Sequence, residues 1–205
     1  MLRRMSVTTD SRHTDGLPIL AFATQHDWEA WLEEHHADTA GLWLKITKQG
    51  AAAPSVTYAE ALEGALCFGW IDGQKAALDE QHWLQKFTPR RAKSIWSRVN
   101  RAKAEALMAA GRMHPAGLVQ VEAAKADGRW AAAYDSQRTI AVPPDFQREL
   151  DAHAQAREFF HTLDRANRYA ILWRVHTAKR PATRAARIAK FIEMLCRHER
   201  LHPER

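Results

Sequence analysis

Hydrophobic positions in the N-terminal half recur first at helical and then at strand spacing. Trp28, Trp31 and Leu32 fall on one face of a predicted helix, and Asp27 is placed to cap its start. The segment LWLKIT at 42–47 alternates the two sides of a strand, with its leucines and isoleucine on one face. The sequence therefore predicts a helix followed by a strand that buries one face.

The next pattern predicts a second helix followed by a hairpin. Thr57 and Glu60 form a capping box at the start of the helix, because each side chain can satisfy the backbone N–H of the other. Residues 70–78 and 81–88 have strand character and are separated by a turn near Asp79. Together with the earlier strand they predict a small, mostly antiparallel sheet.

After the hairpin the pattern becomes helical. Ser94 is placed to cap a helix that runs to Ala110, and Pro115 lies in the first turn of the next one. Three further helical patterns follow Pro144, the first of them interrupted near His153. The second of these places four side chains on one face: Tyr169, Leu172, Trp173 and His176. The third begins with a proline and buries four side chains: Ile188, Phe191, Ile192 and Leu195.

These elements predict an α+β fold, in which a small, mostly antiparallel sheet packed with helices is followed by an all-helical C-terminal part. Residues 1–16 are expected to form a disordered tail. The Pro143-Pro144 pair is the best candidate for a boundary. We therefore expect an α+β domain at 17–142 and a helical subdomain at 143–205 that shares its core.

Composition and charge narrow the possible partners. The chain has 205 residues, a net charge of +6 and a pI near 9.6, which favour nucleic acid, phosphates or acidic surfaces as partners. The N-terminus has no apolar segment typical of a signal peptide, and no run is long enough to span a membrane, so a cytoplasmic location is expected. Cys67 and Cys196 are far apart and have no metal-ligand spacing, so neither a metal site nor a cofactor is predicted.

The segment FTPRRAKSIWSRVN at 87–100 is the strongest candidate site. It carries basic residues and hydroxyls at a predicted helix start, where backbone N–H groups attract anions. Trp96 is placed to stack on a nucleic-acid base. The candidate anion-binding residues are Arg90, Arg91, Lys93, Ser94, Trp96, Ser97 and Asn100. The alternative is structural: the arginines pair with acids such as Asp72 or Glu63, and Trp96 belongs to the core.

A second basic cluster has the same design. Lys179 and Arg180 precede another helix start, and Thr183 and Arg184 lie in its first turn. If the two clusters converge, they form a groove for a phosphodiester chain or a charged metabolite. The alternative is a solvated basic helix face.

The segment ALCFGWIDG at 65–73 supplies three further candidates. An enzyme would use Asp72 or Cys67 together with a histidine, next to Trp70, but no catalytic motif with these residues is present. The structural alternative places Cys67 in the core and lets Asp72 hold a basic residue. Whether the chain is an enzyme stays open.

Four segments carry a family resemblance: ALCFGWIDG, FTPRRAKSIWSRVN, LMAAGRMHPAGLVQVEAAKADGRW and AKRPATRAARIAKFIEML. In order and spacing they resemble the bacterial YdeI/OmpD-associated family, also described as bacteriocin-protection proteins. Gly64 departs from the acidic residue expected there. The resemblance implies a role in bacteriocin protection and an association with a porin, and it implies no catalytic residue or cofactor.

The sequence leaves three functions open. The sequence favours an anion-binding protein with nucleic acid as its ligand. A second hypothesis is an enzyme acting on a phosphorylated or carboxylated small molecule. The third is an interaction module of a stress or envelope response, whose basic surface meets an acidic protein partner.

Overall fold

The computed structural model describes residues 11–51, 55–135 and 139–203, which form two compact units. The first unit contains the described residues up to Ile95 together with Asn100–Ala131. The second contains Trp96–Val99 and the described residues from Ala132 onward. The division after Ala131 lies ahead of the Pro143-Pro144 boundary expected from the sequence.

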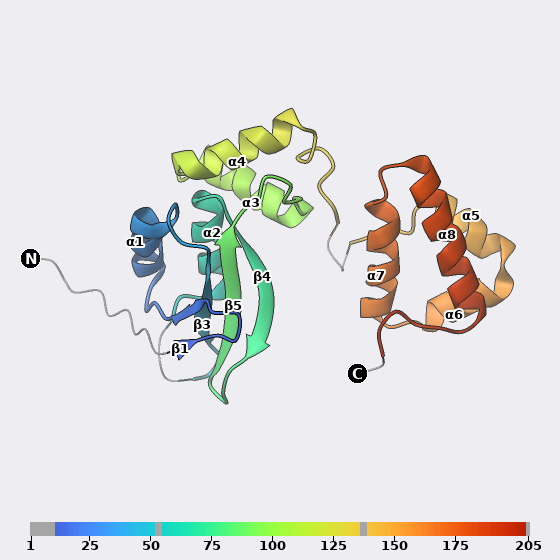
Figure 1. Ribbon diagram of the computed structural model, residues 1–205, viewed down its shortest axis with the longest axis horizontal. Helices are drawn as coiled ribbons and strands as arrows, with labels where there is room; N and C mark the ends of the chain where they lie inside the picture. Colours follow the sequence, from blue (N-terminus) through green and yellow to red (C-terminus); the bar gives the residue numbers. More distant parts are fainter. Residues whose placement is uncertain (1–10, 52–54, 136–138, 204–205) are drawn as a thin grey trace, which may run out of the picture. The chain divides into compact units, whose positions relative to one another are not determined.

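The first unit is built on a five-stranded sheet with the strand order β1-β2-β3-β5-β4 (Figure 1). The strands are β1 (Ser11–Arg12), β2 (Pro18–Leu20), β3 (Leu42–Thr47), β4 (Trp70–Ala77) and β5 (His82–Pro89). All pairings are antiparallel except that of β2 with β3. The three longer strands and the mostly antiparallel sheet confirm the predicted α+β class, whereas β1 and β2 were not predicted.

The start of the chain differs from the expected tail. Residues 1–10 lie outside the described residues, but Ser11–Arg12 pairs with β2, and Asp15 forms an ion pair with Lys86 of β5. Residues 11–16 are therefore folded onto the sheet. Long-range pairing of this kind leaves no periodicity in so short a segment, and this explains the error.

Two helices cover one face of the sheet: α1 (Gln25–His35) and α2 (Tyr58–Cys67) (Figure 1). Trp28 lies between them and the sheet, with its indole Nε1 donating to the Ala61 carbonyl and its ring near Phe87 of β5. Thr24, not Asp27, is the N-cap of α1. Asp27 is the third residue of that helix and completes a capping box with Thr24.

Helix α2 and helix α4 (Pro115–Ala126) cross at very short range. A Cβ atom on Gly117 would lie 2.1 Å from the Cys67 carbonyl oxygen. Gly64 is also fixed by packing, because a Cβ there would lie 2.9 Å from the Trp28 ring. The missing acidic side chain at position 64 is thus a packing requirement of this chain, since an acidic side chain would meet the buried indole.

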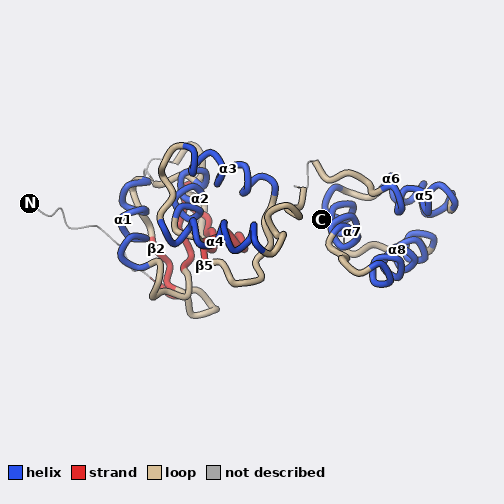
Figure 2. The backbone as a smooth tube through the Cα atoms, turned by 90° about the horizontal axis from the view of Figure 1, so that it is seen from above, coloured by secondary structure: helices blue, strands red, loops and turns tan. Residues whose placement is uncertain are grey.

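The second unit contains four helices among its described residues: α5 (Pro144–Ala152), α6 (Ala154–Thr162), α7 (Arg165–His176) and α8 (Pro181–Cys196). The helical pattern is interrupted at His153, between α5 and α6, as predicted. The last helix begins at Pro181, also as predicted. Figure 2 shows that the strands all lie in the first unit and that the second unit is helical.

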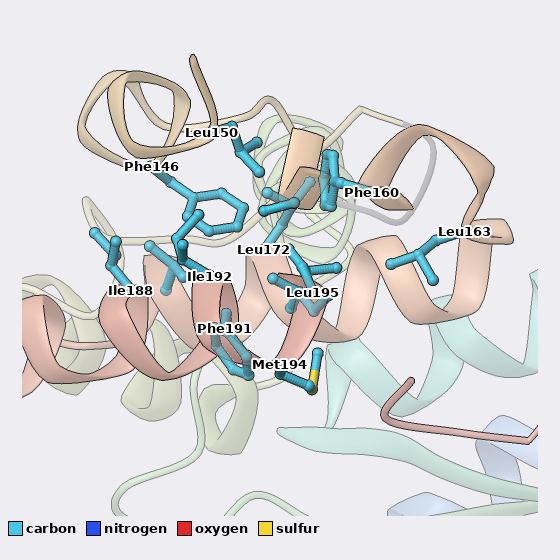
Figure 3. Close-up of a cluster of buried hydrophobic side chains, with 13 residues drawn as sticks. Phe146, Leu150, Phe160, Leu163, Leu172, Ile188, Phe191, Ile192, Met194 and Leu195 are labelled. Atoms are coloured by element: carbon cyan, nitrogen blue, oxygen red, sulfur yellow. The ribbon is translucent and has the colours of Figure 1, made fainter. Parts of the chain in front are cut away.

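The helices of the second unit enclose a hydrophobic cluster of their own. Phe146, Phe160, Leu172, Phe191 and Leu195 are almost fully buried there, and Figure 3 shows their side chains between the four helices. Every member of this cluster belongs to the second unit. The cluster therefore gives the helical unit a core made from its own residues.

Helix α7 buries only part of the face on which four side chains were expected to lie together. Its buried aliphatic side chains are Ile171, Leu172 and Val175, whereas Tyr169 and Trp173 are half-buried. The hydrophobic spacing fits either face. The compact aliphatic side chains take the core because they fill the space beside Phe191 and Leu195 of α8.

Candidate functional site

A polar pocket lies on the face of the sheet opposite α1 and α2. Ile71 of β4 and Thr88 of β5 are cross-strand partners, and both line the pocket. Lys86 lies two residues before Thr88, so it projects from the same face. The volume of about 530 Å³ suits a small molecule. The remaining lining residues are Asp15, Leu17, Ala40, Gly73, Gln74, Pro89, Arg91 and Ser94.

A β-bulge shapes one edge of this pocket. The register between β4 and β5 shifts between Asp72 and Lys75, and this places Gly73 and Gln74 at the pocket. The amide of the buried Gln85 donates to the carbonyl oxygens of Gly73 (3.0 Å) and Gln74 (3.2 Å) from the opposite face. These hydrogen bonds satisfy the carbonyls that the bulge removes from the ladder and hold the edge in place.

Asp15 brings a carboxylate to the same pocket. Lys86 Nζ donates to Asp15 at 2.7 Å, and the Trp43 indole Nε1 donates to both carboxylate oxygens at 3.1 Å. The backbone N–H of Leu17 donates at 3.2 Å. The hydrogen bond from Lys86 is the main cause that holds the pKa of Asp15 well below its usual range. Asp15 is therefore an anion throughout the neutral range.

Arg91 supplies the second cation of the pocket. The turn that carries it is closed by the Arg91 N–H, which donates to Ser94 Oγ at 2.9 Å, and the Ser94 carbonyl accepts from Arg129 at 2.7 Å. Arg91 is exposed, and within the described part of the chain no carboxylate lies within ion-pairing distance of its guanidinium. Lys93 is exposed in the same way but does not line the pocket.

Two other members of the predicted basic site are buried. Arg90 is 6% exposed, and its Nη1 donates to the Ile95 carbonyl at 3.3 Å. Trp96 is 1% exposed, so it belongs to the core and cannot stack on a base. The structural alternative is therefore correct for Trp96. Glu63, one expected acidic partner, pairs with Lys103 and Arg112 instead of these arginines.

The helix that Ser94 was expected to cap begins only at Arg98, as α3 (Arg98–Ala109). The Ser94 hydroxyl is engaged with the Arg91 N–H, and Ser97 forms a β-bridge with Tyr134 that keeps the intervening backbone extended. Asn100 lies inside the helix and is buried, and its amide contacts Asp72 at 3.4 Å. The seven predicted residues therefore do not form one anion site at a helix start.

The candidates in ALCFGWIDG have structural contacts. Asp72 accepts from the Tyr58 hydroxyl at 2.8 Å and is not among the residues lining this pocket. Trp70 is buried and donates its indole N–H to the His36 carbonyl. Burial raises the pKa of the Cys67 thiol to about 11, so the reactive thiolate is scarce at neutral pH. These contacts do not support catalysis by Asp72 or Cys67.

The second basic cluster lies in the helical unit. Like the first cluster, it contains both internally bonded and exposed basic side chains. Arg184 forms two hydrogen bonds to the Asp145 carboxylate, at 2.5 and 2.8 Å, and a third to the Val175 carbonyl at 2.7 Å. It is therefore an internal tie between α5, α7 and α8. Lys179, Arg180 and Thr183 are exposed at the start of α8. The two clusters belong to different units, and their convergence into one groove stays a prediction.

Two other cavities are lined by residues of the helical unit. One, of about 680 Å³, is lined by the half-buried Tyr169 and Trp173 of α7 together with Asp164 and His202. The other lies beside the Arg184–Asp145 pair. Among the described residues, no group of three or more histidine, cysteine or acidic side chains is placed to hold a metal ion.

Of the residues that line the sheet pocket, Arg91 and Ser94 were predicted from the sequence, whereas Asp15, Gln74, Lys86 and Thr88 were not. Lys86 and Thr88 are ordinary polar positions of an alternating strand, and Gln74 reaches the pocket through the bulge. Asp15 lies in the segment expected to be a tail. The alternation of β5 was the one available signal, because it places Lys86 and Thr88 on the face opposite Phe87.

Fold and site together define an α+β protein with a polar pocket on its sheet, followed by a helical domain. Residues 139–198, which include α5 to α8, match the family described as "Bacteriocin-protection, YdeI or OmpD-Associated". The match agrees with the family resemblance in this C-terminal part, but of the four motifs behind the resemblance only AKRPATRAARIAKFIEML lies within the matched residues. Residues 20–120, which include most of the sheet, match a domain of unknown function, DUF8412.

The searches of curated proteins and of solved structures found no match. None of the helices in the described ranges has both the length and the hydrophobicity needed to cross a bilayer. The cytoplasmic location expected from the sequence stays a prediction.

Proposed function

We propose that the first unit binds a small anionic molecule, phosphorylated or carboxylated, in the pocket on its sheet. The observation that carries this proposal is the exposed Arg91 guanidinium, which lines a pocket of suitable size and has no carboxylate partner among the described residues. An arginine in this position offers two parallel N–H donors to a carboxylate or phosphate. Thr88, Ser94 and Gln74 add neutral polar groups around it.

A small molecule fits this site better than the nucleic acid that the sequence favours. Sequence-independent binding of single-stranded nucleic acid depends on aromatic side chains that stack on bases. Trp96, the side chain predicted for this role, is buried. The described part of the pocket lining also has only two cations, Lys86 and Arg91, and Lys86 is already paired with Asp15. An acidic protein partner for the remaining basic surface stays a prediction.

The test is isothermal titration calorimetry of the full chain with D-gluconate and D-glucose 6-phosphate as the two probe anions. Arg91→Ala is expected to weaken binding at least about tenfold, because it removes a charged hydrogen-bond donor. Lys93→Ala is the matched control, since it removes an exposed cation two residues away that does not line the pocket. Equal losses in the two variants, or no loss in Arg91→Ala, would refute the site. A single-stranded oligonucleotide is titrated alongside.

We further propose that the chain acts in bacteriocin protection, within a stress response. The support is the match of residues 139–198 to a family with that description. The test is survival of cells lacking this chain during exposure to a bacteriocin, with the wild-type chain supplied again as the control. Survival that does not depend on the chain would contradict this role. Supplying Arg91→Ala in its place shows whether the pocket contributes.

A further inference from the structure

We infer that Asp15 restricts the pocket to singly charged ligands that carry hydroxyl groups, such as sugar acids and other polyhydroxy monocarboxylates, and disfavours phosphate dianions. This inference rests on the proposed function, because it names the class of anion that the same pocket selects. It follows from the charges, the polar groups and the fixed position of one carboxylate.

The charges of the lining residues leave a single net positive charge. Among the described residues that line the pocket, Lys86 and Arg91 are the two cations, and Asp15 is the one carboxylate. Because Lys86 Nζ lies 2.7 Å from Asp15, its charge is largely neutralised within the protein. Arg91 is left to bind one negative charge of the ligand. A phosphate monoester carries between one and two negative charges near pH 7, so its second charge would find no partner and would be repelled by Asp15.

The position of Asp15 is held by more than its cation. Trp43 Nε1, the Leu17 N–H and Lys86 Nζ all donate to this carboxylate, and the His13 ring nitrogen lies 3.5 Å from it. His13 also packs against Trp43, with ring centroids 4.1 Å apart. These contacts come from the segment before β2 and from two strands of the sheet. The carboxylate is therefore a fixed feature of the pocket, able to reject a second negative charge.

The neutral polar groups favour hydroxyls on the ligand. Gln74 has both a donor and an acceptor, Thr88 and Ser94 carry hydroxyls, and all three line the pocket with the Asp15 carboxylate. A carboxylate accepts hydrogen bonds from ligand hydroxyls at the same position where it repels anions. The pocket therefore suits a molecule with one carboxylate for Arg91 and several hydroxyls for the other side chains.

The decisive experiment compares D-gluconate with D-glucose 6-phosphate, two six-carbon polyols that differ in charge, by calorimetry on the full chain. D-Sorbitol, which has the hydroxyls without the charge, is the third probe. We expect the wild-type chain to bind gluconate most tightly. Asp15→Asn keeps an acceptor for Trp43 and removes the negative charge, so it should improve the affinity for glucose 6-phosphate about tenfold relative to gluconate.

A double variant provides the control. Asp15→Asn combined with Lys86→Gln returns the pocket to one net positive charge, and the preference for gluconate should return with it. The inference is overturned if the wild-type chain prefers glucose 6-phosphate, if sorbitol binds as tightly as gluconate, or if Asp15→Asn leaves the ratio of affinities unchanged. If Asp15→Asn fails to fold by circular dichroism, the wild-type comparison alone decides.

Failure of the proposed function gives a different result. If neither anion binds the wild-type chain, or if both anions bind Arg91→Ala as tightly as they bind the wild-type chain, the pocket is not an anion site. If both anions bind and depend on Arg91, but the phosphate binds more tightly, the proposed function stands and the assignment to Asp15 falls.

Discussion

A substitution at the close crossing of α2 and α4 should have two opposing effects on the free energy of unfolding. Gly117 lies in the first turns of α4, and its replacement by alanine would normally stabilise a helix by about 1 kcal/mol. Here the added Cβ would lie 2.1 Å from the Cys67 carbonyl oxygen and 2.8 Å from its carbon, whereas such contacts need at least 3.0 Å. Both atoms are backbone atoms, so the helices must move apart.

The cost of that movement exceeds the gain in helix propensity. Forcing extra volume into a packed interior costs about 1–3 kcal/mol. The hydrogen bond from the His114 N–H to the same Cys67 carbonyl, 3.1 Å long, would also be weakened, at a cost of about 1 kcal/mol. After the gain in propensity is subtracted, we expect Gly117→Ala to lower the free energy of unfolding by about 2 kcal/mol.

The assay is guanidinium unfolding followed by tryptophan fluorescence, which reports on the first unit because Trp28, Trp43 and Trp70 are buried there. Val119→Ala is the control on the same helix. Val119 is 63% exposed, so its replacement should change the stability by less than about 0.5 kcal/mol. A Gly117→Ala variant that is as stable as the wild-type chain, or more stable, would refute the reasoning.

Two further predictions concern titrating groups. Because burial raises the pKa of Cys67 to about 11, only about one thiol in a thousand is ionised at pH 8. Two variants compare the thiols: Cys196→Ser leaves Cys67, and Cys67→Ser leaves the half-buried Cys196. Cys67 should react with a disulfide reagent at least about tenfold more slowly than Cys196 does. Equal rates would contradict this. The hydrogen bonds from Arg184 lower the pKa of Asp145 from 3.8 to about 2, so the folded state is favoured above pH 4 and this contribution is lost as the pH falls toward 2. Since the carboxylate is a third exposed, we expect Asp145→Asn to lower the free energy of unfolding by about 1 kcal/mol at pH 7. Urea unfolding followed by circular dichroism should show a smaller difference between the variant and the wild-type chain at pH 3. An undiminished difference at pH 3 would rule out the ion pair as its cause.

Local patterns gave correct elements wherever the signal lay within a few residues. The capping box of Thr57 and Glu60, the turn near Asp79 and the break at His153 are all present. Each depends on hydrogen bonds or backbone preferences between near neighbours. The start of α1 was misplaced by three residues because Thr24 and Asp27 are both good caps, and only the observed backbone distinguishes them.

The predicted anion site shows where such patterns fail. A run of basic residues around a helix start looks the same whether its arginines face solvent or the interior. The fold buries Arg90 and Trp96, leaves Arg91 and Lys93 exposed, and ties Arg184 to Asp145. Burial depends on which distant segments pack against each side chain, and sequence spacing carries no information about them.

The sequence by itself determined the α+β class, the three long strands, most of the helices and the family that the C-terminal part resembles, because these follow from local periodicity and motifs. Only the tertiary structure decided the pocket, since its charged and polar residues come from three separate segments, around Asp15, around Gln74 and from Lys86 to Ser94. Pairing of β4 with β5 and attachment of residues 11–16 to the sheet bring them together. Such contacts link residues up to 71 positions apart, as between Asp15 and Lys86, and form only when the chain has folded.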